Sequence, residues 1–462
     1  MATSLMEIGE LSHSIGARRV AFSANSCFSS VSIDSRNVEE GCLFFALEGA
    51  SRDGHSFVSA AFNAGARAAV VSSAKLSSFD LVNTARKKGK DLIIVENTLK
   101  GLQDSAKAYL KKFPNMLKIG ITGSSGKTTT KEIAGAIIAT EKNTVMNKGN
   151  MNSETGLPLS VFQTRSCHEA GIFELGMNRR NEILETADVL KPNIALITNI
   201  GTAHIEYFGD KLEILKEKKC IYKFLKENDV ALVPGNDEYA SSLAEGVGGK
   251  VKFYGMDAFA ALEKTRSLGL DGTEITWAGE KIRFALPGKH SLQDAIAAIA
   301  IAREIPVSDN AIKEGLESVK PLFGRLEILK GRATVIRDCY NASPESMEKS
   351  LDFCDSLDWN GRKVYVIGDM LELGTQSREA HSRLGSLLAD SKADGIFLFG
   401  GEVKTAASFL ESKGRSFFHT DDIGKLSKTL DSYAREGDLV LLKGSRGCAL
   451  ERLTDTLMGG KV

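Results

Sequence analysis

The stretch GITGSSGKTTTKE, residues 120–132, decides the fold because it joins an apolar strand to a helix through a glycine turn. The run KIGIT leads into it, and the amphipathic segment TTTKEIAGAIIATE follows. In that context the backbone N–H groups of the turn and of the helix start face anionic oxygens. The sequence therefore predicts a phosphate-binding loop made of Gly123, Ser124, Ser125, Gly126, Lys127, Thr128 and Thr129.

Two side chains of this loop carry the expected chemistry. We expect Lys127 to reach the β- and γ-phosphates of ATP and Thr128 to hold magnesium through its hydroxyl. The common pattern G-x-x-x-x-G-K-[ST] has a glycine five places before Gly126, where this chain has Ile121. The alternative is an ordinary glycine-rich strand–helix turn with a solvated lysine and threonines.

Composition excludes several classes of protein. Lysine plus arginine equals aspartate plus glutamate at 59 each, so no net charge attracts nucleic acid or an anionic membrane. The start MATSLMEIGE lacks the pattern of a signal peptide, and no apolar run approaches the roughly 20 residues of a membrane span. The seven scattered cysteines contain no C-x-x-C and indicate reduced thiols. We therefore expect a cytoplasmic protein without nucleic-acid partners, and a monomer.

The order of strand and helix patterns predicts an α/β protein of three domains, since 462 residues exceed one core. Residues 1–115 form a small mixed α/β unit that ends near KKFPNML. Across residues 116–320, apolar runs alternate with helical segments, which indicates a parallel sheet buried on both faces. Residues 321–462 repeat a strand followed by glycine three times, which predicts a Rossmann-like domain.

Two polar residues end buried strands of the central domain. Glu174 closes the run GIFEL, where an unpaired carboxylate is costly unless it meets a cation. His204 follows the run IALITNI, and both strand ends should share the sheet edge that carries the phosphate loop. Glu174 and His204 are therefore candidate magnesium ligands, and a hydrogen-bonded structural role is the alternative for each.

Lys218 is an anomaly in the predicted helix KLEILKEKKCIYKFL. Its helical neighbours Ile214, Leu215, Ile221 and Tyr222 are all apolar or aromatic. An ammonium group there has a lowered pKa or requires a partner. The alternative is a lysine whose amine extends to the edge of the apolar stripe.

Polar residues gather beside strands at both ends of the chain. VIGDMLELG supplies Asp369 and Glu372 at the end of a C-terminal strand. The C-terminal third also supplies candidate ligand-binding residues that offer both point charges and guanidinium forks; they are Arg325, Asp338, Asn341, Lys443, Ser445 and Arg446. The N-terminal third has turn-forming residues, for which turns are the alternative: Asp34, Ser35, Arg36, Asp53, Gly54 and His55.

Taken together, these stretches resemble the Mur ligase family over almost the whole chain. The resemblance is carried by SIDSR, GITGSSGKTTTKE, NKGNMNSETGLP, ELGMN, TNIGTAHIEYFG, DCYNASPESM, GDMLELG and KGSRG. GDMLELG together with KGSRG is typical of the member that adds a dipeptide, and the DNPR stretch of the diaminopimelate-adding relative is missing.

The resemblance implies a ligase of peptidoglycan precursor synthesis. ATP would phosphorylate the terminal carboxylate of UDP-MurNAc-tripeptide, and the amine of D-Ala-D-Ala would attack the acyl phosphate. It also implies roles by motif: magnesium at Thr128, Glu174 and His204, a carbamylated lysine at Lys218 that supports a second magnesium, and ATP contacts from Arg325 and Asp338. SIDSR and DGH match the segment that holds the UDP moiety.

The chain departs from the family pattern at three places. The motif H-N-x-x-N, from which the resemblance implies ATP contacts, appears as His290 to Asp294, with His290 and Asp294 as the candidates. The asparagine of N-A-N-P is Ser343, and the acid often found two places after the modified lysine is Cys220. Two other functions stay open at this point. One is a sibling ligase with another amino substrate, and the other is a regulatory nucleotide switch, although no guanine-specifying N-K-x-D is present.

Overall fold

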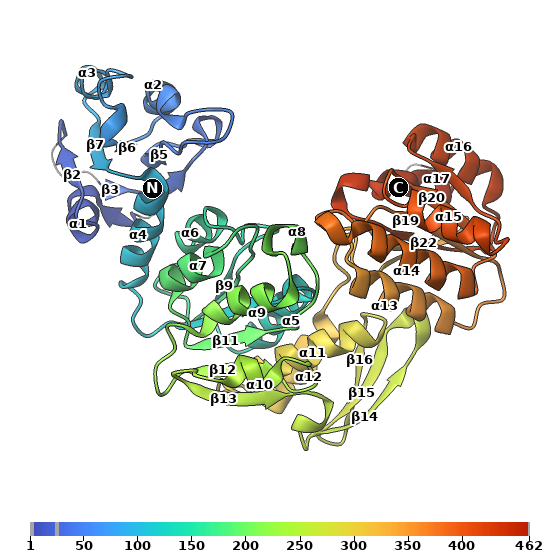
Figure 1. Cartoon of the computed structure of the whole chain (residues 1–462). Helices are drawn as coiled ribbons and strands as arrows, with labels where there is room; N and C mark the ends of the chain where they lie inside the picture. Colours follow the sequence, from blue (N-terminus) through green and yellow to red (C-terminus); the bar gives the residue numbers. More distant parts are fainter. Residues whose placement is uncertain (1–3, 24–26, 461–462) are drawn as a thin grey trace.

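The computed structural model describes residues 4–23 and 27–460, and these form three α/β units arranged along the chain (Figure 1). The N-terminal unit and the C-terminal unit lie on opposite sides of the central one (Figure 1). The three-unit α/β architecture expected from the sequence is confirmed. Within the described residues no helix is long and apolar enough to cross a membrane.

The N-terminal unit is built on a five-stranded sheet in the order β2-β7-β6-β5-β4. Its strands β4 to β7 are parallel, and β2 joins β7 antiparallel at one edge. Their bounds are Arg18–Val20 for β2, Ser30–Ser32 for β4, Cys42–Phe45 for β5, Ala68–Ser72 for β6 and Asp91–Val95 for β7. Strands β5 and β6 are buried on both faces, as parallel strands covered by helices require.

A smaller group of elements completes this unit. A two-stranded sheet pairs β1 (Met6–Glu7) with β3 (Cys27–Phe28). The helices are α1 (Ile8–Ser14), α2 (Val58–Asn63) and α3 (Leu81–Lys88), and short 3-10 turns lie at η1 (Ser35–Asn37), η2 (Gly54–Phe57) and η3 (Ser73–Lys75). Helix α4 (Thr98–Leu110) leads out of the unit and packs against both α1 and the central unit's α6 and α7.

The central unit contains a six-stranded parallel sheet in the order β13-β12-β11-β8-β10-β9. Its strands are β8 (Leu117–Thr122), β9 (Thr144–Met146), β10 (Ala170–Glu174), β11 (Ile194–Ile197), β12 (Val230–Pro234) and β13 (Lys250–Tyr254). Strand β8 lies between β10 and β11, so the loop that leaves β8 is flanked by the ends of both neighbours. This placement brings residues 123–129, 174 and 198–204 to one edge of the sheet.

Helices cover both faces of the central sheet. They are α5 (Lys127–Ile138), α6 (Gly156–Val161), α7 (Glu182–Leu190), α8 (Ile205–Phe208), α9 (Lys211–Lys219), α10 (Ala240–Ala244), α11 (Lys289–Ala302) and α12 (Asp309–Ser318), with 3-10 turns η4 (Cys220–Tyr222), η5 (Met256–Ala258) and η6 (Gly269–Asp271). The alanine-rich α11 packs against α5, as expected of a helix that is apolar nearly all round.

Two features of the central unit differ from the sequence expectation. The helix expected over KLEILKEKKCIYKFL ends at Lys219 and tightens into η4. A three-stranded antiparallel sheet of β14 (Leu262–Ser267), β15 (Thr273–Trp277) and β16 (Glu280–Phe284) was not predicted. Strand β14 has no buried residue, so its sequence lacks the apolar signal of a strand.

The C-terminal unit has a six-stranded sheet in the order β17-β18-β22-β19-β20-β21, with only β17 antiparallel. Its strands are β17 (Glu327–Lys330), β18 (Thr334–Asp338), β19 (Lys363–Gly368), β20 (Gly395–Phe399), β21 (Phe418–Thr420) and β22 (Leu439–Lys443). Its helices are α13 (Pro344–Ser356), α14 (Ser377–Asp390), α15 (Lys404–Ser412), α16 (Ile423–Tyr433) and α17 (Thr454–Met458), with η7 (Gly374–Gln376), η8 (Arg446–Cys448) and η9 (Leu450–Leu453).

Candidate active site

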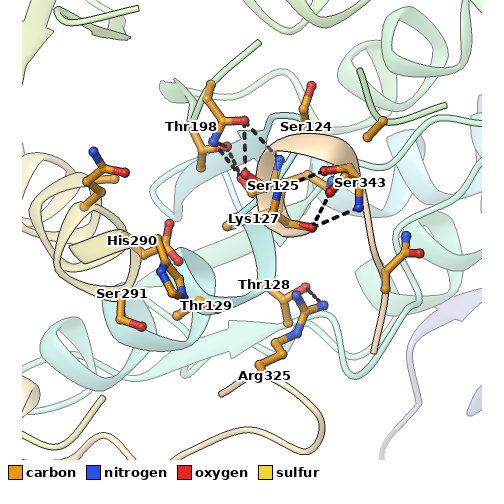
Figure 2. Close-up of a pocket in the computed structure, with 18 of the residues that line it drawn as sticks. Ser124, Ser125, Lys127, Thr128, Thr129, Thr198, His290, Ser291, Arg325 and Ser343 are labelled. Carbon is orange, nitrogen blue, oxygen red and sulfur yellow. Dashed lines mark hydrogen bonds between the residues drawn. The ribbon is translucent and has the colours of Figure 1, made fainter. Parts of the chain in front are cut away.

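The phosphate loop lies between β8 and α5 and is held by residues that follow β11. Thr198 Oγ1 donates to the carbonyl oxygen of Ser125 at 2.6 Å, and Asn199 Nδ2 donates to the same oxygen at 3.0 Å. In return, the backbone N–H of Ser125 donates to Asn199 Oδ1 at 3.1 Å, and Figure 2 shows Ser125 facing Thr198. These bonds fix a loop whose own backbone is irregular.

Glycine is required at the end of this loop because Gly126 has φ of +79°. A Cβ placed there would lie 2.1 Å from Asp294 Oδ1. The absence of a side chain therefore lets α11 approach the phosphate loop closely, and it leaves the first N–H groups of α5 open to an anion.

Glu174 ends β10 beside the loop, as the sequence predicts. Its side chain is 2% exposed, and its Oε2 accepts a hydrogen bond from Thr128 Oγ1 at 2.7 Å. Its Oε1 accepts from Asn152 Nδ2 at 2.7 Å, and Asn147 brackets its backbone by donating to the carbonyl and accepting from the N–H. Glu174 forms no ion pair among the described residues. A buried carboxylate that makes no direct ion pair is thus placed against the Thr128 hydroxyl.

These oxygen atoms fit a magnesium ion. Magnesium prefers oxygen ligands and is commonly held by one or two protein oxygens together with substrate phosphates. The Thr128 hydroxyl and the Glu174 carboxylate are already adjacent, and they border the same cavity as His204. Across residues 4–23 and 27–460, no group of three or more His, Cys, Asp or Glu side chains is arranged to hold a metal ion.

Lys218 is buried, as the apolar stripe of its helix predicts, with 1% of its surface exposed. Its Nζ donates to the carbonyl oxygen of Gly123 at 2.9 Å and lies 3.6 Å from Met177 Sδ. Lys127 Nζ donates to the same Gly123 oxygen at 2.8 Å. Desolvation lowers the pKa of Lys218 well below its ordinary value, and the nearby Lys127 charge lowers it further.

The C-terminal unit contributes directly to the site through Arg325. Arg325 Nη2 donates to Thr128 Oγ1 at 3.0 Å, and the guanidinium stacks on the Tyr340 ring at 4.3 Å. Figure 2 shows Arg325 and Thr128 pointing toward one another. The Arg325 guanidinium of the C-terminal unit therefore lies next to the Thr128 hydroxyl, which also donates to Glu174 of the central unit.

Asp338 and Lys443 of the same unit form a largely buried ion pair at the border of the cavity. Lys443 Nζ lies 2.8 Å from Asp338 Oδ2, and the two side chains are 3% and 13% exposed. Asp338 also accepts from Ser350 Oγ at 2.6 Å, and Lys443 also donates to the carbonyl of Asn341 at 3.2 Å. The pair ties the adjacent strands β18 and β22 at the ends that face the cavity.

His290 and Asp294 lie on α11 and border the cavity. Burial lowers the pKa of His290 to about 4 and raises the pKa of Asp294 to about 8. Both groups are therefore uncharged at pH 7. Asp294 stands where the family pattern has asparagine, and the protonated acid resembles an amide in shape and in its ability to donate a hydrogen bond.

One cavity of about 480 Å³ brings together most of the predicted central and C-terminal residues. The predicted residues that border it are Ser124, Ser125, Gly126, Lys127, Thr128, Thr129, Glu174, His204, His290, Asp294, Arg325, Asp338, Asn341 and Lys443. Gly123 and Lys218 lie behind the loop, and Ser445 and Arg446 lie beyond the lining. Ser445 instead accepts a hydrogen bond from the Leu371 N–H at 2.9 Å.

The N-terminal candidates lie in a separate place. Asp34 pairs with Arg36 on the surface, and this contact lowers the pKa of Asp34 to about 2. His55 is buried: its Nδ1 is 2.6 Å from Asp53 Oδ1 and its Nε2 accepts from the Ser72 N–H at 2.8 Å. With both ring nitrogens occupied, the His55 side chain orders the turn in this structure. Gly54 packs against the backbone of residue 47.

Sequence reasoning assigned no role to several polar residues that complete the site. Asn152 and Asn199 orient Glu174 and the phosphate loop, and Lys349 borders the cavity near Asp294. The motifs NKGNMN and TNIG were visible signals for the asparagines. Lys349 lies on a helix of the C-terminal unit, and its position near α11 depends on how the two units meet.

Known proteins match the chain over nearly its full length. Family models match residues 28–115 (Mur ligase family, catalytic domain), 121–302 (Mur ligase middle domain) and 324–446 (Mur ligase, glutamate ligase domain). The UDP-N-acetylmuramoyl-tripeptide–D-alanyl-D-alanine ligase of Treponema pallidum (strain Nichols) is 42% identical over 433 residues, which are 93% of this chain and 94% of that one. The ligase of the same name from Bacillus subtilis (strain 168) is 33% identical and is covered to 93%, as is this chain.

Solved structures agree with the sequence comparison. MurF from Acinetobacter baumannii superposes with a TM-score of 0.87 at 28% identity, covering 99% of this chain and 100% of that one. The MurF ligase from Thermotoga maritima in complex with ADP gives 0.78 at 28% identity, covering 93% of this chain and 97% of that one. A phosphate loop facing a second domain, three matching family models and full-length relatives lead to one conclusion: the chain belongs to the Mur ligase family.

Proposed function

We propose that this protein is an ATP-dependent amide ligase that adds D-alanyl-D-alanine to UDP-N-acetylmuramoyl-tripeptide, with release of ADP and phosphate. The observation that carries this proposal is the meeting of two domains at Thr128, whose hydroxyl contacts Glu174 from one side and Arg325 from the other. The two relatives of highest identity reported above bear the name of this reaction, and a MurF neighbour was solved with ADP.

The chemistry has two steps. An oxygen of the tripeptide carboxylate attacks the γ-phosphorus of ATP, so that an acyl phosphate forms and ADP leaves. The amine of the dipeptide then attacks the acyl carbon, the bond from that carbon to the bridging oxygen breaks, inorganic phosphate leaves, and the nitrogen loses a proton as the amide forms. Catalysis of phosphoryl transfer is mainly positioning and charge neutralisation. Lys127, Arg325 and the N–H groups that begin α5 supply positive charge for it.

Magnesium is part of the proposal. Thr128, Glu174 and His204 would hold it, and a carbamylated Lys218 would support a second ion. When bound, magnesium neutralises the phosphate oxygens during transfer. The support for carbamylation is the buried amine of Lys218 with its strongly lowered pKa, because a neutral amine is the form that adds carbon dioxide.

Substrate contacts are assigned by domain. The N-terminal residues Asp34, Ser35, Arg36, Asp53 and Gly54 are proposed to hold the UDP moiety. In the C-terminal unit we assign the dipeptide to Asn341, Lys443, Ser445 and Arg446. Arg446 is the exposed cation of this group and lies over the Phe323 and Tyr340 rings, at 5.7 and 5.9 Å from their centroids. The paired N–H donors of its guanidinium group suit a terminal carboxylate.

We further propose that the enzyme acts as a monomer in the cytoplasm, where ATP and the nucleotide precursor are available. A sedimentation experiment at assay concentrations checks the monomer. A sedimentation coefficient that rises with concentration contradicts it.

The test of function is ADP and phosphate release measured with each substrate in turn. We expect release only when ATP, UDP-MurNAc-tripeptide and D-Ala-D-Ala are all present, with one amide formed per ADP. Release with a single amino acid in place of the dipeptide supports a sibling ligase. Release without either substrate supports a nucleotide switch, and both of these results overturn the assignment. Running the assay with tripeptides ending in lysine and in meso-diaminopimelate identifies the third residue.

A further inference from the structure

Two carboxylates of the C-terminal unit dock on one short segment of the central unit, residues 201–206. Glu345, in the first turn of α13, accepts hydrogen bonds from the backbone N–H of Thr202 and from Thr202 Oγ1, both at 3.0 Å. Glu372, in the loop after β19, places Oε2 at 2.7 Å from Nδ1 of His204. The backbone adds a third contact, because the N–H of Glu206 donates to the carbonyl of Glu372 at 3.1 Å.

The docking segment is joined directly to the phosphate loop. The N–H of Gly201 donates to Ser124 Oγ at 2.8 Å, and the N–H of Ser124 donates to the carbonyl of Asn199 at 3.0 Å. A Cβ at Gly201 would lie 3.2 Å from Glu345 Cδ and 3.3 Å from Ser124 Cβ. The Glu345 carboxylate therefore packs against Gly201, and Gly201 packs against Ser124 of the phosphate loop. Docking of the C-terminal unit is thus connected to the phosphate loop by direct contacts.

The loop that presents Glu372 is fixed before it meets the segment. The N–H of Met370 donates to His381 Nε2 at 3.1 Å, and the N–H of Leu371 donates to Ser445 Oγ at 2.9 Å. Glu372 and His204 both adopt the left-handed region, with φ of +63° and +65°. This conformation costs roughly 1 kcal/mol or more for a residue with a Cβ, and such residues gather at functional sites.

The contact places a carboxylate oxygen of Glu372 beside one ring nitrogen of His204. A carboxylate beside Nδ1 favours the neutral tautomer with its proton on that nitrogen, which leaves the lone pair of Nε2 free to accept or to bind a cation. In this structure the N–H direction is not aligned with the oxygen, although the separation is that of a hydrogen bond.

We propose that Glu372 is a positioning residue that sets the tautomer and orientation of His204 across the domain interface, while Glu345 holds the backbone of the same segment. Docking of the C-terminal unit thus completes the geometry around the phosphate loop, and an undocked enzyme has a loosely held imidazole. The link to catalysis rests on the proposed function. The link between Glu372 and the His204 ring does not, so the two can be tested separately.

The first readout is the His204 ring itself. The full-length chain is labelled with ¹⁵N-histidine, and long-range ¹H–¹⁵N spectra are recorded, with His204 assigned from a His204→Gln variant. We expect the Nδ1–H tautomer in the wild type and in Glu372→Gln, whose amide oxygen still accepts the proton. We expect Glu372→Ala to move the His204 signals toward the Nε2–H form. Unchanged His204 signals in Glu372→Ala overturn the proposal, whatever reaction the enzyme catalyses.

The second readout is the initial rate with ATP, UDP-MurNAc-tripeptide and D-Ala-D-Ala. Loss of a residue that orients a ligand of this kind costs about 10- to 100-fold in activity. We expect kcat to fall by that factor in Glu372→Ala, KM for ATP to change less than threefold, and Glu372→Gln to keep at least a third of the wild-type kcat. Equal losses in the alanine and glutamine variants overturn the proposal. If neither the wild type nor any variant forms the amide, the proposed function is wrong. The spectra of His204 then still decide whether Glu372 positions its ring.

Glu345 is tested with a matched control on its own helix. Glu348 also lies on α13 but pairs with Arg383 inside the C-terminal unit. We expect Glu345→Gln to lower kcat about threefold to tenfold by loosening the segment, and Glu348→Gln to leave it within twofold. Equal losses of kcat in the two variants contradict a specific role of Glu345 in holding residues 201–206. Because both changes are isosteric and lie near the surface or the interface, neither removes core packing.

Discussion

Lys127 and Lys218 donate to the same carbonyl oxygen, that of Gly123, at 2.8 and 2.9 Å. Two ammonium groups cannot share one acceptor without repulsion, and burial lowers the pKa of both. The pKa of Lys218 is lowered more than that of Lys127. Burial and the Lys127 charge therefore favour the neutral form of the Lys218 amine behind the phosphate loop, which is a physical reason for the modification proposed there.

The first prediction concerns that amine. Lys218→Ala is expected to reduce ligation by about a hundredfold or more, as loss of an anion or its metal site does in preorganised centres. Acetate at high concentration should restore part of the rate by replacing the missing carboxylate-like group. Lys216→Ala, an exposed neighbour on α9 that pairs with Glu213, should retain near wild-type turnover. Unchanged turnover in Lys218→Ala would refute the role.

The second prediction concerns Asp294 and pH. Because burial raises its pKa to about 8, the acid is neutral at pH 7 and gains a negative charge as pH rises through 8. That charge lies beside Gly126 of the phosphate loop, so it opposes the phosphates of ATP. We expect the Kd for ATP to rise several-fold between about pH 7 and pH 9, measured by calorimetry. In Asp294→Asn this rise should vanish; an identical pH profile in both proteins counts against the mechanism.

The same shift has a consequence for stability. An unfolded aspartate loses its proton near pH 3.8, whereas Asp294 keeps it to about pH 8. Between these values the unfolded state binds fewer protons, so the contribution of Asp294 to stability declines as pH rises and is fully lost above about 8. Asp294→Asn should therefore raise Tm at pH 8 more than at pH 5. Scanning calorimetry at the two pH values, without nucleotide, checks the difference.

The third prediction concerns the buried pair of Asp338 and Lys443. Removing one partner leaves an uncompensated buried charge, so Lys443→Met is expected to destabilise by about 3–5 kcal/mol. The double variant Asp338→Asn, Lys443→Met should recover part of that loss because no charge is stranded. Urea unfolding of the three proteins measures it. A double variant less stable than the single one contradicts this account of the pair.

The fourth prediction separates crowding from backbone strain in the phosphate loop. Gly126→Ala introduces backbone strain, because φ is +79°, and also crowding, because the new Cβ would clash with Asp294. Gly16→Ala introduces backbone strain alone, because φ is +64° and no heavy atom lies within 4 Å of the position of the new Cβ. The control should cost about 1–2 kcal/mol in stability. Gly126→Ala should cost more and should also abolish ATP binding by calorimetry; equal behaviour of the two variants would remove Asp294 from the explanation.

Local patterns predicted the centre of the site well, for reasons visible in particular residues. The strand–glycine–helix order located the phosphate loop, and the unbroken apolar run before Glu174 indicated its buried strand end. Lys218 stood out because its four helical neighbours are apolar. In each case the information lies within a few residues of the position, where periodicity and burial leave a direct trace.

What the sequence could not supply depends on contacts between distant segments. His204 belongs to the central unit and Glu372 to the C-terminal unit, far apart in the sequence, and only the meeting of the two units pairs them. His55 has the same kind of sequence context as its polar neighbours, yet it turns inward to bind Asp53 and the Ser72 N–H. The sheet of β14 to β16 was missed because β14 has no buried side chain to mark it.

Helix α4 joins the first unit to the second by packing, whereas the third unit meets the second around the candidate active site. Helix α4 packs against elements of both the first and the second units, and Lys107 pairs with Asp188 across that junction at 2.7 Å. At the boundary of the second and third units, Arg325, Glu345 and Glu372 make polar contacts, and the apolar residues Ile205 and Leu373 belong to one hydrophobic cluster. The junction between the first two units is thus held both by helix packing and by an ion pair, so a ligand that touched both units would meet surfaces already joined to each other.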